Sequence, residues 1–258
     1  MPPARKRTRT YDPARTRTAV LAQFGNVRAA VGVLTPEQLE LPTRLGEWTV
    51  GELVTHIGMA LESVDRLLGV PEPGRQDATV LDWPPAASAD LTHAFRPCPG
   101  PGAFLADVEK SLIQHLAEQP ATRLLDTNAG AMPLADYLVT RTVELVVHTD
   151  DLNAAVPGLG ITHDRQALAA ATRLLADALA AKAPGASTEV RVPPFAVVQC
   201  VEGPRHTRGT PPNVVETDPL TWVRLATGRV EWSAALAEAK VSASGERADL
   251  SGLLPLMA

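Results

Sequence analysis

Residues 133–155 constrain the fold of this chain more than any other segment. If the segment is helical, leucines lie on one side of it and valines on the other. These are Leu134, Leu138, Leu145 and Leu152 on the first side, and Val139, Val143, Val146 and Val147 on the second. A helix that is apolar all the way round is buried among other elements. We therefore expect a buried central helix from about Pro133 to Ala155.

Four other segments show the three- and four-residue spacing of apolar side chains that is typical of helices packed on a core. They span residues 13–34, 49–69, 102–119 and 163–183. The second begins with Thr49 and Glu52, which have the spacing of a capping box. Together they predict a helical bundle over residues 13–184, preceded by a disordered basic arm over residues 1–12. Residues 70–101 contain seven prolines and are expected to form a loop that is a lid, a binding loop or a partly disordered segment.

The character of the sequence changes after Gly185. Short runs rich in β-branched residues replace the helical spacing, at residues 189–192, 195–201, 213–216 and 241–243. Two helical pieces lie among them, at residues 218–226 and 247–256. This order of strands and helices predicts a second, small α/β domain over residues 187–258.

Charge and hydropathy exclude several classes of protein. Lys and Arg number 24 against 29 Asp and Glu, and six of the cations lie in the first 17 residues. The rest of the chain is net negative and has no basic face for a row of phosphates, so we expect no nucleic-acid partner. No apolar run reaches the roughly 18 residues of a membrane span, and the N-terminus lacks the apolar stretch of a secretory signal. We therefore expect a cytoplasmic protein with no membrane span.

Within the central helix, Glu144 and His148 lie four residues apart, so both side chains project from one face. The neighbours Val143 and Leu145 indicate that Glu144 is buried, and a buried carboxylate is costly unless it is paired or bound to a metal ion. Two interpretations follow. Glu144 forms an ion pair with Arg141, or it binds a divalent ion together with His148. In the second case Arg141 is free to bind an anionic substrate group and is our candidate catalytic residue.

A metal site needs a third ligand. His56, on the edge of the apolar stripe of its helix, is one candidate, and His115, on the apolar face of another helix, is the rival. Asp151 lies three residues beyond His148 on the same helix. It is expected either to accept a hydrogen bond from the His148 ring and fix its tautomer, or to be a solvated acid near a helix end.

Two motifs carry a family resemblance. The first is Gly46-Glu-Trp-Thr-Val-Gly-Glu-Leu-Val-Thr-His56, in which a tryptophan-containing turn precedes a helix that carries a histidine. The second is Glu144-x-x-x-His148-x-x-Asp151. Together they resemble the mycothiol-dependent maleylpyruvate isomerase family, which belongs to the wider DinB-like helical bundles. The resemblance implies that His56, Glu144 and His148 are the ligands of a divalent metal ion and that mycothiol is the thiol cosubstrate.

The resemblance also implies the fold class. It covers residues 14–180 and implies a DinB-like four-helix bundle. Residues 215–232 and 240–250 are similar to a bacterial sterol-carrier-type domain, although the domain predicted here is shorter than a full carrier. The expected class is α plus α/β, a DinB-like four-helix bundle followed by a small α/β sterol-carrier-like domain.

Two neutral imidazoles and one carboxylate leave coordination positions open, as in catalytic zinc sites, so zinc is the first choice of metal. An ion in such a site can ionise a thiol or activate water. We therefore expect a metal-dependent and mycothiol-dependent S-transferase or isomerase that acts on a small electrophile. The alternative is a non-catalytic metal-binding carrier that holds an apolar ligand in its sterol-carrier-like domain. The complete ligand set favours the enzyme, and the short second domain disfavours the carrier.

Overall fold

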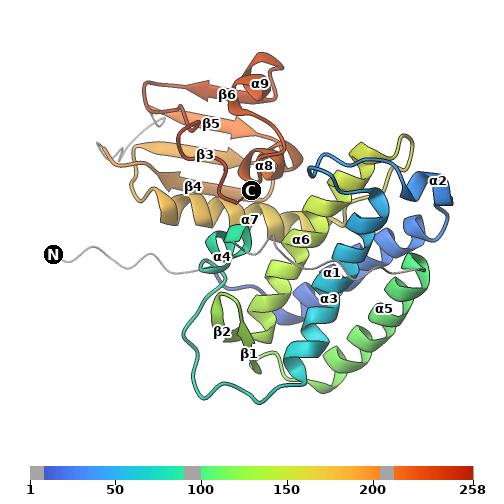
Figure 1. Ribbon diagram of the computed structural model, residues 1–258. Helices are drawn as coiled ribbons and strands as arrows, with labels where there is room; N and C mark the ends of the chain where they lie inside the picture. Colours follow the sequence, from blue (N-terminus) through green and yellow to red (C-terminus); the bar gives the residue numbers. More distant parts are fainter. Residues whose placement is uncertain (1–8, 90–99, 204–211, 258) are drawn as a thin grey trace.

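The computed structural model describes residues 9–89, 100–203 and 212–257. Its N-terminal part is helical, and its C-terminal part holds a small sheet (Figure 1). The N-terminal elements are α1 (Pro13–Val31), α2 (Pro36–Leu39), α3 (Val50–Leu68), α4 (Trp83–Ala89), α5 (Pro101–Glu118), β1 (Leu124–Thr127), β2 (Gly130–Pro133) and α6 (Leu134–Ala155). The C-terminal elements are α7 (Arg165–Lys182), β3 (Thr188–Val192), β4 (Ala196–Cys200), β5 (Val214–Thr217), α8 (Pro219–Ala226), α9 (Trp232–Ala237) and β6 (Val241–Ser244).

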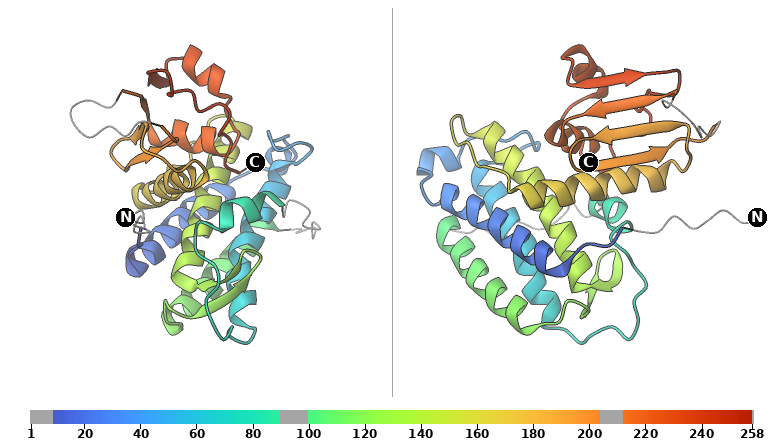
Figure 2. Two further views of the ribbon diagram at one scale, coloured as in Figure 1. Left: turned by 90° about the vertical axis from the view of Figure 1, so that its left-hand side faces the viewer. Right: turned by 180° about the vertical axis from the view of Figure 1, so that it is seen from behind.

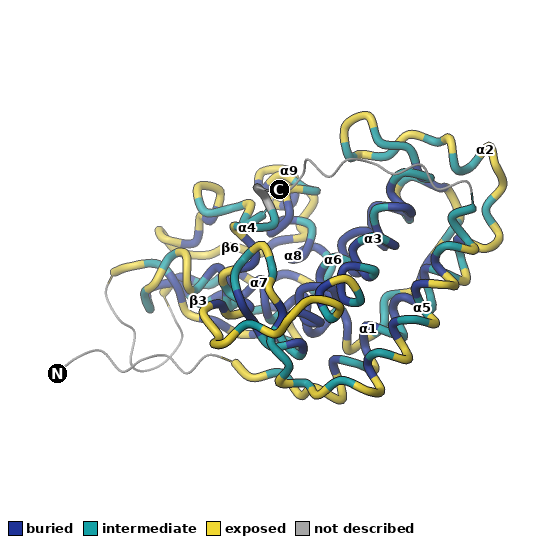
Figure 3. The backbone as a smooth tube through the Cα atoms, turned by 60° about the horizontal axis from the view of Figure 1, so that its bottom comes forward, coloured by how far each residue is buried: buried dark blue, intermediate teal, exposed yellow. Residues whose placement is uncertain are grey.

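Helix α6 is buried along most of its length, as predicted (Figure 3). Its leucine side packs into a core shared with α1, α3 and α5. Its valine side packs into a second core shared with α7 and the C-terminal sheet. The two apolar sides seen in the sequence therefore serve two different cores, and α6 joins them.

The C-terminal sheet has the strand order β4-β3-β5-β6. The β3–β5 pair is parallel, whereas β3–β4 and β5–β6 are antiparallel. Helix α7 lies between this sheet and α6, in contact with both (Figures 1 and 2). The expected combination of a helical bundle with a small α/β domain is confirmed.

Three short features were not predicted, namely helix α4, the β1–β2 hairpin and helix α9, and one predicted helix was wrong. Helix α4 lies inside the expected loop, where Pro84 and Pro85 occupy the first turn, a position that tolerates proline. The β1–β2 hairpin precedes α6. Residues 247–256 form turns rather than a helix, because Gly252 and Pro255 disfavour one and the backbone N–H of Leu256 donates to Ala226 of α8.

The N-terminal arm is described only from Arg9, which forms an ion pair with Asp177 of α7. Residues 1–8 lie outside the described residues. Among the described helices, none is both long enough and apolar enough to cross a lipid bilayer.

The connection from α7 to β3 is clamped against the end of β4. The backbone N–H of Val201 donates to Ala183 at 2.8 Å, and that of Ser187 donates back to Val201 at 3.2 Å. A Cβ atom on Gly185 would lie 1.9 Å from the Val201 carbonyl oxygen. The close approach of two backbone segments therefore requires glycine here.

We predict that Gly185→Ala destabilises the protein by about 3 kcal/mol, because backbone atoms cannot rotate away as a side chain can. Urea unfolding followed by circular dichroism measures the change. Gly74→Ala is the matched control, since nothing lies within 4 Å of its Cβ position. Equal stability of the two variants would contradict the prediction.

Candidate metal centre

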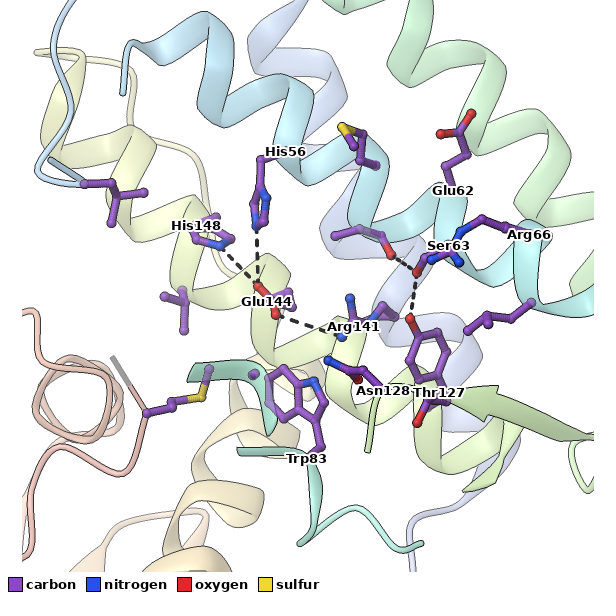
Figure 4. A pocket seen from close by; sticks show the side chains of 18 of the residues that line it. His56, Glu62, Ser63, Arg66, Trp83, Thr127, Asn128, Arg141, Glu144 and His148 are labelled. Atoms are coloured by element: carbon purple, nitrogen blue, oxygen red, sulfur yellow. Dashed lines mark hydrogen bonds and ion pairs between the residues drawn. The ribbon is translucent and has the colours of Figure 1, made fainter. Parts of the chain in front are cut away.

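Three side chains meet where α3 passes α6. Ligand atoms of His56, Glu144 and His148 all lie within 4.8 Å of one another. The His148 Nε2 atom is 3.1 Å and the His56 Nε2 atom 3.9 Å from Oε2 of Glu144 (Figure 4). The structure thus brings together the three residues that the sequence selected, two from one helical face and one from the neighbouring helix.

The local structure of α3 sets the position of His56. The predicted capping box is present, with Thr49 and Glu52 each accepting a backbone N–H of the other. It begins α3 two helical turns before His56, directly after the turn that carries Trp48. The rings of Trp48 and His56 lie 5.0 Å apart between centroids, so the tryptophan packs beside the histidine.

The second ring nitrogen of His148 is held by Asp151. Its Nδ1 atom lies 2.9 Å from Oδ2 of Asp151, whose side chain is wholly buried. This contact turns Nε2 toward Glu144 and His56, the orientation that a metal ligand needs. Asp151 is therefore not a solvated acid in this structure.

The pKa values follow from burial and from these hydrogen bonds. Burial opposes the charge on His148, but hydrogen bonds to Asp151 and Glu144 outweigh it and raise the pKa of His148 to about 9. Burial also disfavours the charge on Glu144, yet His148, His56 and Arg141 hold its pKa well below the usual range. Burial lowers the pKa of His56 and keeps this imidazole neutral near pH 7. Glu144 as a carboxylate and His56 as a free base are both ready to bind a cation.

Arg141 forms a long ion pair with Glu144, so both interpretations of this carboxylate find a partner in the structure (Figure 4). Its Nη2 atom is 3.9 Å from Oε1 of Glu144, farther than His148 is. Its guanidinium lies over two rings, 4.6 Å from the Tyr137 centroid and 5.7 Å from that of Trp83. Its side chain is only 9% exposed. The aromatic contacts fix the guanidinium between the histidines and the rest of the pocket.

One pocket of about 930 Å³ is lined by the three clustered side chains together with Trp48, Trp83, Tyr137 and Arg141. Its walls come from α3, α4, the β1–β2 hairpin and α6, with Arg229 and Met257 added by the C-terminal part of the chain. The periodicity of the sequence did not predict several of the residues that line the pocket. They are Ser63, Trp83, Asp126, Thr127, Asn128, Tyr137, Arg229 and Met257.

The rival ligand His115 takes no part in the cluster. The Nδ1 atom of His115 lies 2.6 Å from Asp65 between α5 and α3, and His115 is not among the clustered ligands. Cys200 is buried in β4 and is not among the clustered ligands either.

Comparison with known proteins assigns the family. A family profile described as "Mycothiol maleylpyruvate isomerase N-terminal domain" matches residues 20–153, more than half of the chain. The chain belongs to this family. A second profile, described as "Bacterial SCP ortholog", matches residues 164–256. A search of curated protein sequences found no match.

Solved structures share the fold of this family member from end to end. The mycothiol-dependent maleylpyruvate isomerase is 14% identical, with a TM-score of 0.54, and a mutant of that enzyme is 13% identical, also with a TM-score of 0.54. Each alignment covers 93% of this chain and 95% of the other. The second profile begins at Asp164, the N-cap of α7, so the matched region includes α7 with the sheet. The division near residue 184 stays a prediction.

Arginines from outside α6 bind the two acids that follow His148. Asp150 accepts hydrogen bonds from Arg44, in the loop before α3, and from Arg224 of α8, the latter at 2.6 Å. Asp151 accepts from Arg44 at 2.6 Å and from Arg229 at 3.1 Å. In this member of the family, the C-terminal part of the chain is thus fastened to the helix turn that carries a candidate metal ligand.

We predict that Arg224→Ala lowers the free energy of unfolding at pH 7 by about 2 kcal/mol, since it removes charge-assisted hydrogen bonds from the buried Asp150. Burial raises the pKa of Asp150, but Arg224 and Arg44 outweigh it and lower that pKa. A lowered pKa gives stability that is present above the unfolded value of about 3.9 and is lost as the pH falls through the folded value. The difference from wild type should therefore shrink below about pH 4.

Urea titrations at pH 7 and pH 3 measure both effects. Arg191→Ala is the matched control, because Arg191 pairs with Glu189 and Glu216 on the more exposed sheet. It should cost less than about 1 kcal/mol. A cost for Arg224→Ala that matches the control, or that does not change with pH, would show that the pair with Asp150 does not stabilise the fold.

Proposed function

We propose that this protein is a divalent-metal-dependent enzyme that uses mycothiol to act on a small anionic electrophile, as an isomerase or an S-transferase. The observation that carries the proposal is the cluster of His56, Glu144 and His148 on the wall of a pocket beside a buried arginine. The structural relatives are a mycothiol-dependent maleylpyruvate isomerase and its mutant, which supports the use of mycothiol and an isomerase reaction. Zinc is the proposed ion, because zinc accepts mixed imidazole and carboxylate ligands.

A divalent ion held by these three residues would lower the pKa of a bound thiol and supply a thiolate nucleophile. The chain contributes the geometry around it. The Asp151 carboxylate accepts the Nδ1–H of His148, so that Nε2 presents its lone pair once its proton has left. His56 is neutral near pH 7 because of its burial and needs no deprotonation.

Arg141 is proposed to bind the anionic group of the substrate. Its guanidinium opens to the pocket beside the ligand cluster, and the rings of Tyr137 and Trp83 hold its plane. When Glu144 binds a cation, its negative charge is no longer available to Arg141. The guanidinium then offers a planar pair of donors that fits a carboxylate.

The structure does not favour the carrier alternative. The inward side chains of the C-terminal sheet, including Val190, Val192 and Val215, are buried together with Trp222 and the α7 side chains in one packed core. The pocket over the metal residues instead uses Arg229 and Met257 as part of its wall. We therefore propose that the C-terminal part completes the site of an enzyme.

We predict that the purified protein binds one zinc ion and that His148→Ala loses it. Metal analysis after dialysis against zinc measures the content, and calorimetry in two buffers measures the protons released. Binding near pH 7 should release about one proton, because the pKa of His148 is raised to about 9 and Nε2 must be deprotonated to bind.

His115→Ala is the control, since this histidine pairs with Asp65 away from the cluster. It should keep the zinc. Asp151→Ala should bind zinc about 10- to 100-fold more weakly, as expected when the residue that orients a ligand is removed. Equal zinc content in His148→Ala and wild type would contradict the metal site.

We predict that Arg141→Gln lowers kcat/KM for maleylpyruvate about 10- to 100-fold, the loss expected for a charge-assisted hydrogen bond. The dimethyl ester of this dicarboxylate is the matched substrate, and Arg141→Gln should turn it over about as fast as wild type does. In the cobalt-substituted protein, the sulfur-to-metal charge-transfer band with mycothiol should be unchanged. An equal loss on acid and ester would show that Arg141 does not bind the carboxylate.

A further inference from the structure

The pocket has a second end, on the far side of Arg141 from His148 (Figure 4). Glu62 and Arg66 of α3 form one side of it, and the β1–β2 hairpin forms the other. The hairpin residues are Asp126, Thr127 and Asn128. We call these five residues the polar rim. The proposed function uses the metal end and Arg141, and it leaves the polar rim without a role.

The hairpin side of the polar rim is held rigidly in place. Both Asp77 and Ala78 donate backbone N–H groups to the Ala131 carbonyl, at 3.1 and 3.0 Å, and the Ala131 N–H donates to the Asp77 side chain at 2.7 Å. Gly130 closes the turn with a φ of +112°, where a Cβ would lie 2.8 Å from the Asp77 side chain. The turn that carries Asn128 is thus formed before any ligand arrives, which lowers the entropic cost of binding.

The wall beside the polar rim presents an acceptor oxygen. Ser63 Oγ donates its single proton to the Ala60 carbonyl at 2.6 Å. The Tyr137 hydroxyl, 2.7 Å from the same Oγ, must therefore act as the donor in that contact. The Tyr137 oxygen keeps its lone pairs, and both residues line the pocket. Such an oxygen suits a ligand that carries hydroxyl groups.

The charge of the polar rim excludes a second anion site. The polar rim holds two carboxylates, Glu62 and Asp126, and one guanidinium, Arg66, so its net charge is negative and opposes binding of a carboxylate or phosphate. Carboxylates accept hydroxyl protons, while the Arg66 and Asn128 side chains donate to hydroxyl oxygens. A pocket of about 930 Å³ also lies in the range that holds a drug-sized ligand, larger than a small acid alone.

From these observations, and resting on the proposed use of a thiol, we propose that the polar rim binds the hydroxyl-rich sugar part of mycothiol. The sulfur then reaches past Arg141 to the cluster of His56, Glu144 and His148. The metal end recognises the thiol group and the polar rim recognises the remainder of the molecule.

Two thiols separate these contributions. Mycothiol and N-acetylcysteine, which carries no sugar, are titrated into the cobalt-substituted protein, and the charge-transfer band reports binding. Asp126→Ala and Asn128→Ala should each weaken the binding of mycothiol about 3- to 10-fold, the effect of one lost hydrogen bond. The affinity for N-acetylcysteine should not change. Alanine suits position 128, because the φ of Asn128 is not positive. Asp107→Ala, on the exposed face of α5, is the matched control and should change neither thiol.

A second titration does not involve the metal or the sulfur. The sugar part of mycothiol without its cysteine is added to the metal-free protein and followed by NMR, with inorganic phosphate as the anionic comparison. We expect the sugar to shift signals of the hairpin in wild type but not in Asn128→Ala. Phosphate should not shift them.

The failure of each proposal has its own signature. If neither thiol gives a charge-transfer band in wild type, the proposed function fails. The sugar titration then tests by itself whether the polar rim binds the sugar. If the rim variants do not change the affinity for mycothiol, or lower the affinity for both thiols equally, the polar rim does not bind the sugar. Hairpin signals that respond to phosphate rather than to the sugar would likewise overturn the assignment.

Discussion

The burial of the Asp151 carboxylate is the constraint on which the rest of the structure depends. A carboxylate with no exposed surface is stable only when cations and hydrogen-bond donors surround it. The donors here are Arg44, Arg229 and His148, and each comes from a different part of the chain. Burying Asp151 therefore requires the loop before α3, the segment after α8 and the last turns of α6 to meet. Those same parts carry or adjoin the candidate metal ligands, so the packing that stabilises the fold also aligns the site.

Helix α6 connects these interactions because it belongs to two cores. The bundle holds its leucine side, and α7 with the C-terminal sheet holds its valine side. Its polar residues lie between these two apolar sides. Arg141, Glu144 and His148 line the pocket, and Asp150 forms an ion pair with Arg224. A shift of the C-terminal part would disturb Asp150 and Asp151 directly. The position of the C-terminal part therefore affects the orientation of His148 through the hydrogen bonds of Asp150 and Asp151.

The elements that could be predicted from the sequence are those with long-range periodicity. The spacing of apolar residues gave α6 and its burial, and the capping box at Thr49 gave the start of α3. The cluster followed, because Glu144 and His148 share a helix face, but the choice of His56 over His115 rested on the family resemblance. The hairpin, α4 and α9 were missed because four to seven residues carry too little periodicity. The turns over residues 247–256 were misassigned because the apolar spacing of Leu250, Leu253 and Leu254 outweighed Gly252 and Pro255 in the prediction.

This division between periodic and irregular elements has a functional consequence. The candidate metal ligands and Arg141 lie on α3 and α6, which the two cores fix in place. The hairpin residues of the polar rim and Met257 lie instead on a turn-bearing hairpin and in the C-terminal turns, where substitutions disturb less of the core. A chain of this fold can therefore keep one ligand cluster while its pocket walls change. Specificity for the electrophile that reacts with the thiol is expected to vary through those short elements, and the chemistry at the cluster through α3 and α6.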